Sequence, residues 1–181
     1  NYRDDIWYYG QLNRTTWVDA GVNEYALATS GGYLYSHEKG PNDGQPSGAA
    51  PLAINSYIES AFMDIADGEF YMLTKKVIPD VDFTSSQTVN PVTGATLTPA
   101  VDMAVAVTKF PGAATQTTDV AGTTLTRGVT TTATTIDQYT NQVFIRARGR
   151  QMNFKISSDT VGTQWQLGDT RVDAKPDGMR G

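Results

Sequence analysis

The sequence predicts an all-β protein, namely an antiparallel β-sandwich or barrel-like domain preceded by a β-hairpin segment. Three observations predict this class. Thr, Val, Tyr and Gly are abundant and turn-forming residues recur along the chain, a composition typical of strands. Apolar and polar residues alternate in several short runs, as in half-buried strands. A Gly-Gly pair separates two β-forming runs, which indicates a tight hairpin because glycine tolerates positive φ.

We expect the β-hairpin segment at residues 1–45. Candidate strands cover residues 7–9, 15–18, 25–29 and 33–35, and Gly31-Gly32 joins the last two. Residues 40–51 contain many Gly and Pro residues and no periodicity, which predicts a loop or linker. We therefore place a second domain, the β-sandwich, at residues 46–181.

Residues 55–66 fit two structures. Apolar residues at positions 57, 58, 61, 62 and 65 fall on one helical face, and Ser56 with Glu59 matches a capping box. In a strand, residues 57, 61, 63 and 65 share a face that Glu59 interrupts. The local pattern slightly favours the helix.

The following strands are predicted from alternation and turns. Asp67-Gly68 indicates a turn into residues 70–73, whose two faces are both apolar, as in a strand buried on both sides. The clearest half-buried strand is at 101–107, where apolar side chains alternate strictly: Val101, Met103, Val105 and Val107. Further alternating strands cover 143–148 and 152–157, and a strand at 163–167 is interrupted at Gly168-Asp169 before continuing at 171–173.

Residues 114–135 contain eleven threonines and little apolar content. Such low complexity is typical of a flexible loop or of a long exposed hairpin arm. The β-branch of Thr disfavours a helix but suits an exposed strand. We favour a projecting loop or arm.

Bulk composition excludes several classes of site. The chain has 14 basic and 19 acidic residues, a net charge of −5, whereas a general nucleic-acid binder normally carries a basic excess. It has no Cys, which excludes disulfides and thiolate metal sites. No apolar run approaches the roughly 20 residues of a membrane span.

The sequence predicts no catalytic, metal or cofactor site. His37 stands beside Glu38, no Gly-x-Ser-x-Gly motif is present, and we expect His37 to be a polar residue at a hairpin end. The carboxylates lack a calcium-loop spacing and fit turns and solvated strand faces, although a close pair across a cleft would suit glycoside hydrolysis; they are Asp64, Asp67, Glu69, Asp80 and Asp82. The three Trp and nine Tyr residues indicate core and interface anchors or, alternatively, sugar stacking.

Arg146, Arg148 and Arg150 form the most pointed pattern. Alternate residues of a strand share a face, so three guanidinium groups would line up about 7 Å apart. Their partner would be an acidic face of a neighbouring subunit, a phosphate or a glycan carboxylate, because arginine binds such groups bidentately. The alternative is pairing within the chain, with acids such as Asp64 or Asp80, or plain exposure. We take the three arginines as a candidate subunit interface.

Several short motifs in a fixed order resemble the C-terminal part of tail hub, or nozzle, proteins of short-tailed bacteriophages, of the packaged-DNA stabilisation or tail tubular type. They include RTTW at 14–17, GYLYSHEKG at 32–40 and ARGRQ at 147–151, and continue at 57–60, 64–68, 77–80, 165–168 and 177–178. The resemblance implies that the hairpin segment at 1–45 is propeller-like and that residues 55–66 form a strand. The Thr-rich stretch departs from the family. The chain is too short for a complete propeller, so we expect part of a longer protein or a reduced version.

The resemblance implies a structural virion protein located in a phage tail and without catalytic residues. It would form a ring, typically of six identical subunits, contact neighbouring tail or adaptor proteins, and let the genome pass without specific binding. A mildly acidic surface suits such a conduit, because it does not hold sliding phosphates. The alternative function is a carbohydrate-binding or receptor-binding β-sandwich module of a virion.

Overall fold

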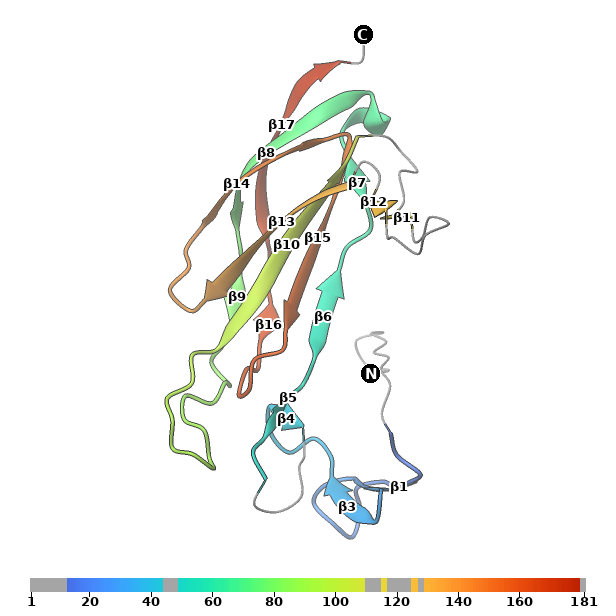
Figure 1. Cartoon of the computed structure of the whole chain (residues 1–181), viewed down its shortest axis with the longest axis vertical. Coiled ribbons are helices and arrows are strands. Elements are labelled where there is room, and N and C mark those ends of the chain that lie inside the picture. The colour runs from blue at the N-terminus through green and yellow to red at the C-terminus, as the bar shows by residue number, and fades with distance from the viewer. Residues whose placement is uncertain (1–12, 44–48, 110–114, 117–124, 127–128, 180–181) are drawn as a thin grey trace. The chain divides into compact units, whose positions relative to one another are not determined.

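The computed structural model describes residues 13–43, 49–109, 115–116, 125–126 and 129–179 (Figure 1). The chain divides into two compact units, Asn1–Gly40 with Gly44–Pro51, and Pro41–Asp43 with Leu52–Gly181. The described residues contain many strands and no α-helix. The all-β class is therefore confirmed, whereas the predicted boundary between residues 45 and 46 lies outside the described residues and stays a prediction.

The first unit contains a three-stranded antiparallel meander. Its strands are β1 (Thr16–Val18), β2 (Leu27–Ser30) and β3 (Tyr33–Ser36), paired in that order. Gly31 and Gly32 connect β2 to β3 with φ of 55° and 83°, the two positive values that a type I′ turn needs. The predicted Gly-Gly hairpin is confirmed. The expected strand at 7–9 lies outside the described residues, and the propeller-like character stays a prediction.

The second unit is built on two antiparallel sheets. We call the first the front sheet; its order is β13 (Val129–Asp137), β10 (Ala100–Thr108), β15 (Gln151–Ser158) and β6 (Ser56–Glu59), and β7 (Met63–Asp64) also pairs with β15. The second, the back sheet, has the order β14 (Val143–Gly149), β8 (Phe70–Ile78) and β17 (Arg171–Met179). Both sheets have open edges, so the fold is a sandwich and not a closed barrel.

Short elements complete the second unit. Three two-stranded ladders pair β4 (Asn42–Asp43) with β5 (Leu52–Ala53), β9 (Val81–Asp82) with β16 (Gln166–Leu167), and β11 (Thr115–Gln116) with β12 (Leu125–Thr126). A 3-10 turn, η1 (Ala66–Gly68), precedes β8, which confirms the turn predicted at Asp67-Gly68. Residues 55–66 contain the short strands β6 and β7 and no α-helix, so strands are found where the local pattern favoured a helix.

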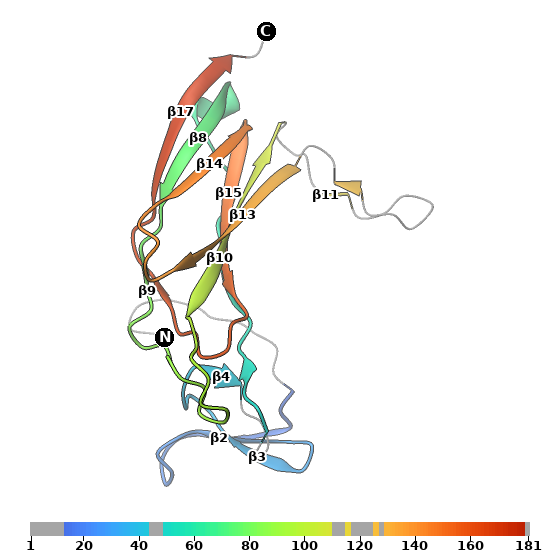
Figure 2. The same ribbon diagram turned by 60° about the vertical axis from the view of Figure 1, so that its left-hand side comes forward.

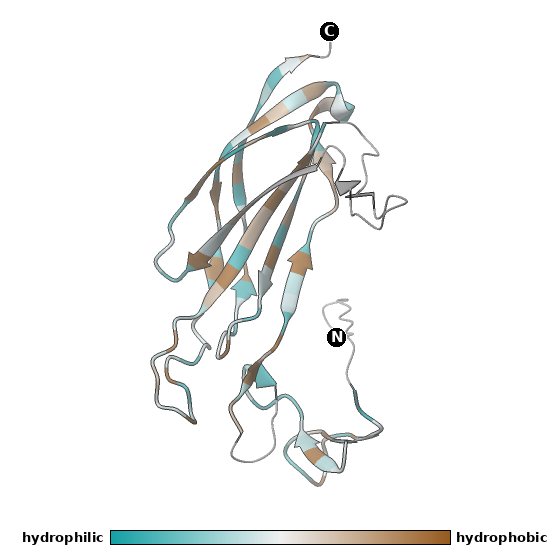
Figure 3. Ribbon diagram, viewed as in Figure 1, coloured by the Kyte–Doolittle hydropathy of each residue, from teal (hydrophilic) through white to brown (hydrophobic). Residues whose placement is uncertain are grey.

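The core lies between the two sheets, which appear as two layers in Figure 2. Val101, Met103 and Val105 of β10 are each 1% exposed and Val107 is 5% exposed, so the predicted alternation of this strand is confirmed. Figure 3 shows that hydrophobic and hydrophilic residues follow one another along the strands of both layers. The other strands add further buried apolar side chains, namely Met72, Val77, Ile136, Val143, Ile145, Ala147, Met152 and Ile156.

In the middle of β8, the central strand of the back sheet, the alternation of buried and more exposed residues shifts by one position. Met72 and Thr74 are buried, and the next buried residue is Val77. The pairing with β17 shifts by one residue at this point, between Asp173 and Ala174. Such a bulge adds one residue to β8 and returns Val77 to the core face. The apolar run predicted to be buried on both sides is thus buried on one face and half-buried on the other, where Tyr71 and Leu73 lie.

Part of the Thr-rich stretch belongs to the sandwich. Residues 129–135 lie in β13, which pairs with β10 over nine consecutive positions without a register shift. Residues 129–135 are thus part of a sheet edge rather than of a projecting arm, since the following Ile136 is 1% exposed in the core. Residues 115–116 and 125–126 pair as the antiparallel strands β11 and β12. Residues 117–124 and 127–128 lie outside the described residues.

Candidate functional site

The three predicted arginines do not share one environment. Arg146 and Arg148 lie on the exposed face of β14, together with Phe144, whereas Arg150 is only 8% exposed. The expected row of three therefore contains two members. The alternation stops because the chain leaves the back sheet after Gly149 and enters the front sheet at Gln151.

Gly149 forms the corner between the two sheets. A Cβ atom on this residue would lie 2.7 Å from the backbone oxygen of Thr108 and 2.8 Å from Cβ of Val107. The backbone N–H of Arg150 donates to the same Thr108 oxygen at 2.7 Å. The corner is thus packed directly against the end of β10, which fixes where the Arg150 side chain begins.

Arg148 is held within the chain. Its Nε atom lies 2.5 Å from Oδ2 of Asp177, its Nη2 donates to the backbone oxygen of Asp177 at 2.9 Å, and its Cζ lies 4.4 Å from the centroid of the Tyr71 ring. The two charged side chains are about half exposed, so the pair adds about 0–1 kcal/mol to stability. The alternative of pairing within the chain named acids such as Asp64 or Asp80, but the acid that pairs with Arg148 is Asp177.

Arg146 presents the unpaired charge of β14. Its side chain is exposed, and it forms no ion pair or hydrogen bond with the described residues. Phe144, two residues earlier on the same face, is 74% exposed. β14 is an edge strand of the back sheet, so this face combines an aromatic ring, a free guanidinium and an open sheet edge. Aromatic residues and arginine are enriched at protein interfaces.

Arg150 and Thr108 each contain one buried side-chain atom without a hydrogen-bond partner in the described structure. These atoms are Nε of Arg150 and Oγ1 of Thr108, and Thr108 is 2% exposed. The Cζ atom of Arg150 lies 5.4 Å from the centroid of the Tyr71 ring. Leaving one buried N–H donor without an acceptor costs about 1–3 kcal/mol.

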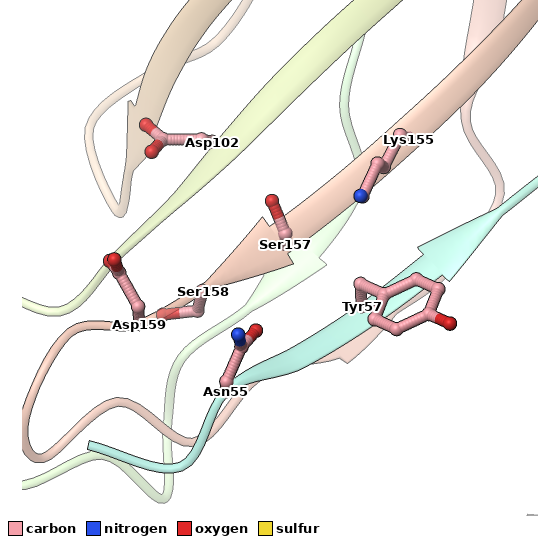
Figure 4. Close-up of a pocket in the computed structure, with 7 residues that line it drawn as sticks. All are labelled: Asn55, Tyr57, Asp102, Lys155, Ser157, Ser158 and Asp159. Carbon is pink, nitrogen blue, oxygen red and sulfur yellow. The ribbon is translucent and has the colours of Figure 1, made fainter. Parts of the chain in front are cut away.

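A polar groove of about 320 Å³ lies on the outer face of the front sheet (Figure 4). The strand register sets its floor: Asp102 of β10 pairs with Ser157 of β15, and Ser157 pairs with Tyr57 of β6. Lys155 of β15 adds a further lining residue, and Asn55, Ser158 and Asp159 line the groove at or beside strand ends. The groove therefore offers hydroxyl, amide, carboxylate and ammonium groups within one concave surface.

Two contacts fix side chains in this groove. The Oγ1 of Thr135 donates to Oδ1 of Asp102 at 2.7 Å, and Nζ of Lys155 lies 4.8 Å from the centroid of the Tyr57 ring. The sequence placed Asp102, Lys155 and Ser157 on the outer faces of two strands, but alternation does not reveal which strands are neighbours. No sequence pattern indicated that Tyr57 would join them.

The first unit contains an aromatic cluster around the single histidine. The rings of Trp17 and His37 are 4.5 Å apart, and Nε of Arg14 donates to Nε2 of His37 at 3.2 Å. The guanidinium of Arg14 lies 4.3 Å from the centroid of the Tyr35 ring. His37, which follows β3, thus contacts Arg14 and Trp17 from the β1 end of the same unit.

Three of the carboxylates that the sequence raised as acid–base candidates accept hydrogen bonds: Asp82 from Thr84 in the turn after β9, Asp80 from the backbone N–H of Asp169, and Asp64 from Gln151. Hydrogen bonds from the Thr84 side chain and backbone hold the pKa of Asp82 below its ordinary value, and the Thr140 side chain has the same effect on the pKa of Asp137. Within the described ranges, no three His, Asp or Glu side chains are arranged to hold a metal ion. No helix in that part of the chain is long and apolar enough to cross a membrane.

No protein-family model matches the sequence, and a search of curated proteins found no significant match.

Proposed function

We propose that this chain is a structural protein of a virion, part of the hub or nozzle ring of a bacteriophage tail through which the genome leaves. The motif order described above supports the family, and the all-β sandwich agrees with it. The exposed row on β14, with Phe144 74% exposed beside Arg146, is the observation that carries the assembly role. Its chemistry is that of a subunit contact.

The ring contact would join the β14 row of one copy to an acidic face of the next. Such a contact between different faces closes into a ring by rotation, and charge complementarity sets its register and excludes wrong partners. The chain has a net charge of −5, so acidic residues are in excess. This excess can supply the acidic face of the contact and the inner surface of a conduit that does not retain DNA. Neighbouring tail or adaptor proteins would bind the remaining surfaces, and no catalytic step or cofactor is involved.

Charge reversal at Arg146 tests the contact. Arg146 has no partner in the described chain, so Arg146→Glu would remove the intermolecular attraction without breaking an internal pair. A change at Arg148, in contrast, would also break its pair with Asp177. We expect weaker self-association in sedimentation velocity experiments. Arg171→Glu, an exposed change on β17, is the matched control. Equal self-association of Arg146→Glu and the unaltered chain would contradict the contact.

The location in the virion needs a separate experiment. Antibodies raised against the chain should label native particles on the tail axis below the capsid in immunogold electron micrographs. Labelling of the capsid surface or of tail fibres would contradict the hub assignment, whatever the outcome at Arg146.

The polar groove of the front sheet favours a second candidate, carbohydrate or receptor binding. Its carboxylate, amide and hydroxyl groups resemble what a saccharide's hydroxyls require, and Tyr57 is 52% exposed at its rim. A glycan array probed with the isolated chain separates the two functions. Binding that Asp102→Asn abolishes would favour the receptor role, and an array without binding would leave the structural role.

A further inference from the structure

The front sheet ends at β13, whose outer edge is open. β13 pairs with β10 over nine consecutive positions, and no strand of the described residues pairs with its other side (Figure 1). Ala133 and Thr135 of β13 are exposed. An open edge presents a row of unpaired N–H and C=O groups and can therefore accept a further strand.

Hydrogen bonds at the end of β13 show which of its backbone groups point away from β10. Asp137 donates from its N–H to Oγ1 of Thr140 at 3.2 Å and accepts from the N–H of Thr140 at 3.1 Å. Its partner in β10, Ala100, accepts from Oγ of Ser158 at 2.9 Å, on the side of β15. Asp137 and Ala100 therefore turn their backbone groups away from each other. Because antiparallel pairs alternate along a ladder, every second residue before Asp137 also presents its N–H and C=O to the open edge, and Ala133 is one of them.

The other edges of the two sheets carry features that hinder strand pairing. β14 has Arg146 and Arg148 and a register shift, β17 has Pro176 and two register shifts, and β6 and β7 are four and two residues long. Charges, proline, bulges and short strands are the usual protection of an edge. β13 has none of them: residues 129–136 include no charged residue, Pro or Gly, and its register with β10 is unbroken. These features leave the exposed face of β14 free for side-chain contacts but make β13 the edge that suits backbone pairing.

The sequence of β13 indicates what its edge pairs with. Residues 131–135 read Thr-Thr-Ala-Thr-Thr, which is the same in both directions. In an antiparallel pair of two such strands centred on Ala133, Thr therefore lies opposite Thr and Ala opposite Ala. Cross-strand Thr pairs are favourable, whereas like charges placed opposite each other are not. Each chain carries a net charge of −5, so two copies approach most easily through a neutral strand such as this one.

We propose that β13 of one copy pairs with β13 of a second copy, antiparallel and centred on Ala133. The backbone groups of Ala133 already point outward, so the two central residues exchange both of their N–H···O=C bonds. The contact joins the two front sheets into one and is isologous, since the same strand serves on both sides of a two-fold axis. It does not rest on the phage-tail assignment, and it uses a different edge from the proposed β14 contact.

Cysteine cross-linking tests the register, because the chain contains no Cys. In Ala133→Cys, the two Cα atoms of the central pair would lie about 5.5 Å apart, within the range that a disulfide spans. In Thr135→Cys, on the same exposed edge, the two thiols would be offset by about four residues, or roughly 14 Å. Oxidation of the full chain should give a covalent dimer for Ala133→Cys and not for Thr135→Cys. No dimer for Ala133→Cys, or equal yields for both variants, would overturn the proposal.

A charge at the two-fold axis tests the contact in solution. The variants are made in the Arg146→Glu chain, which lacks the proposed β14 contact, and self-association is measured by sedimentation equilibrium. Ala133→Lys places two ammonium groups opposite each other and should raise the dimer Kd about five-fold or more. Ala133→Thr keeps the strand neutral and should leave the dimer intact. Ala133 is exposed, so neither change disturbs the core, which urea unfolding verifies. A monomeric Arg146→Glu chain, or an equal Kd for Ala133→Lys and Ala133→Thr, would overturn the pairing and leave the β14 contact to its own test.

Discussion

A methyl group added at the corner of the sandwich tests whether the two sheets are joined as tightly as the structure indicates. In Gly149→Ala, the new Cβ would lie 2.7 Å from the Thr108 oxygen, 2.8 Å from Cβ of Val107 and 3.2 Å from the Gln151 oxygen. Two of these neighbours are backbone atoms and the third is the Cβ of a core residue. None can turn away as the end of a long side chain can, so the backbone itself must move.

This crowding sets how much unfolding free energy Gly149→Ala should lose. Overpacking of a well-packed site costs about 1–3 kcal/mol of unfolding free energy, and contacts with backbone atoms place this case in the upper half of that range. The Gly149 φ is not positive, so Ala also stiffens the unfolded chain and recovers about 0.4–1 kcal/mol. We expect a net loss of about 2 kcal/mol.

Gly94→Ala is the matched control in the same unit. Its new Cβ would meet no atom within 4 Å, but its φ is +69°. A left-handed conformation costs an L-residue about 1–2 kcal/mol, part of which the unfolded-state effect offsets. We therefore expect Gly94→Ala to lose about 1 kcal/mol or less, through conformation alone and without crowding.

Urea unfolding followed by Trp165 fluorescence measures both losses. Trp165 packs against the core of the second unit, and its Nε1 donates to Oγ of Ser56 at 2.9 Å. The midpoint should fall further for Gly149→Ala than for Gly94→Ala, with unchanged slopes. A Gly149→Ala chain as stable as the unaltered one, or more stable than Gly94→Ala, would refute the tight corner.

Met103 is 1% exposed in the core, and Met103→Ala should lower the free energy of unfolding by about 2–5 kcal/mol in the same urea assay. Met179 is 67% exposed, and Met179→Ala should lower it by less than about 0.5 kcal/mol. Equal losses would contradict the assigned core. Thr140→Val should raise the pKa of Asp137 towards its ordinary value of 3.8 in an NMR titration, because the Thr140 hydroxyl is the main cause of the lowered pKa. A lowered folded-state pKa gives stability that is present above the unfolded value and is lost as the pH falls through the folded value. This loss, below pH 3.8 in the unaltered chain, should therefore be smaller in Thr140→Val, and an unchanged Asp137 titration would contradict the turn.

Local sequence rules predicted the individual strands well where burial alternates without interruption. Val101 to Val107 and the Gly31-Gly32 hairpin are examples, because side-chain direction in a strand and positive φ in a turn are decided within a few residues. The same rules misled where the chain departs from regular geometry. The row of three arginines fails at Arg150 because the strand ends one residue earlier, at Gly149, and the next strand belongs to the other sheet.

The candidate sites depended on non-local pairing. Asp102, Ser157 and Tyr57 form one groove because β10, β15 and β6 are neighbours, and nothing in their local sequence names those neighbours. The fate of Arg148 depended in the same way on Asp177, which is 29 residues away along the chain. The spacing of the arginines indicated an interaction, but the acid that pairs with Arg148 could be identified only after β17 was placed beside β8.

The sequence by itself determined that this chain forms strands, where many of them run, and which of their faces are apolar, because these properties follow from side-chain period and turn chemistry. The tertiary structure decided which strands pair, where the bulge in β8 restores Val77 to the core, and which arginine is buried. The reason is physical: the free energy that selects these pairings comes from apolar surface buried between distant segments, and a local pattern is compatible with several such partners.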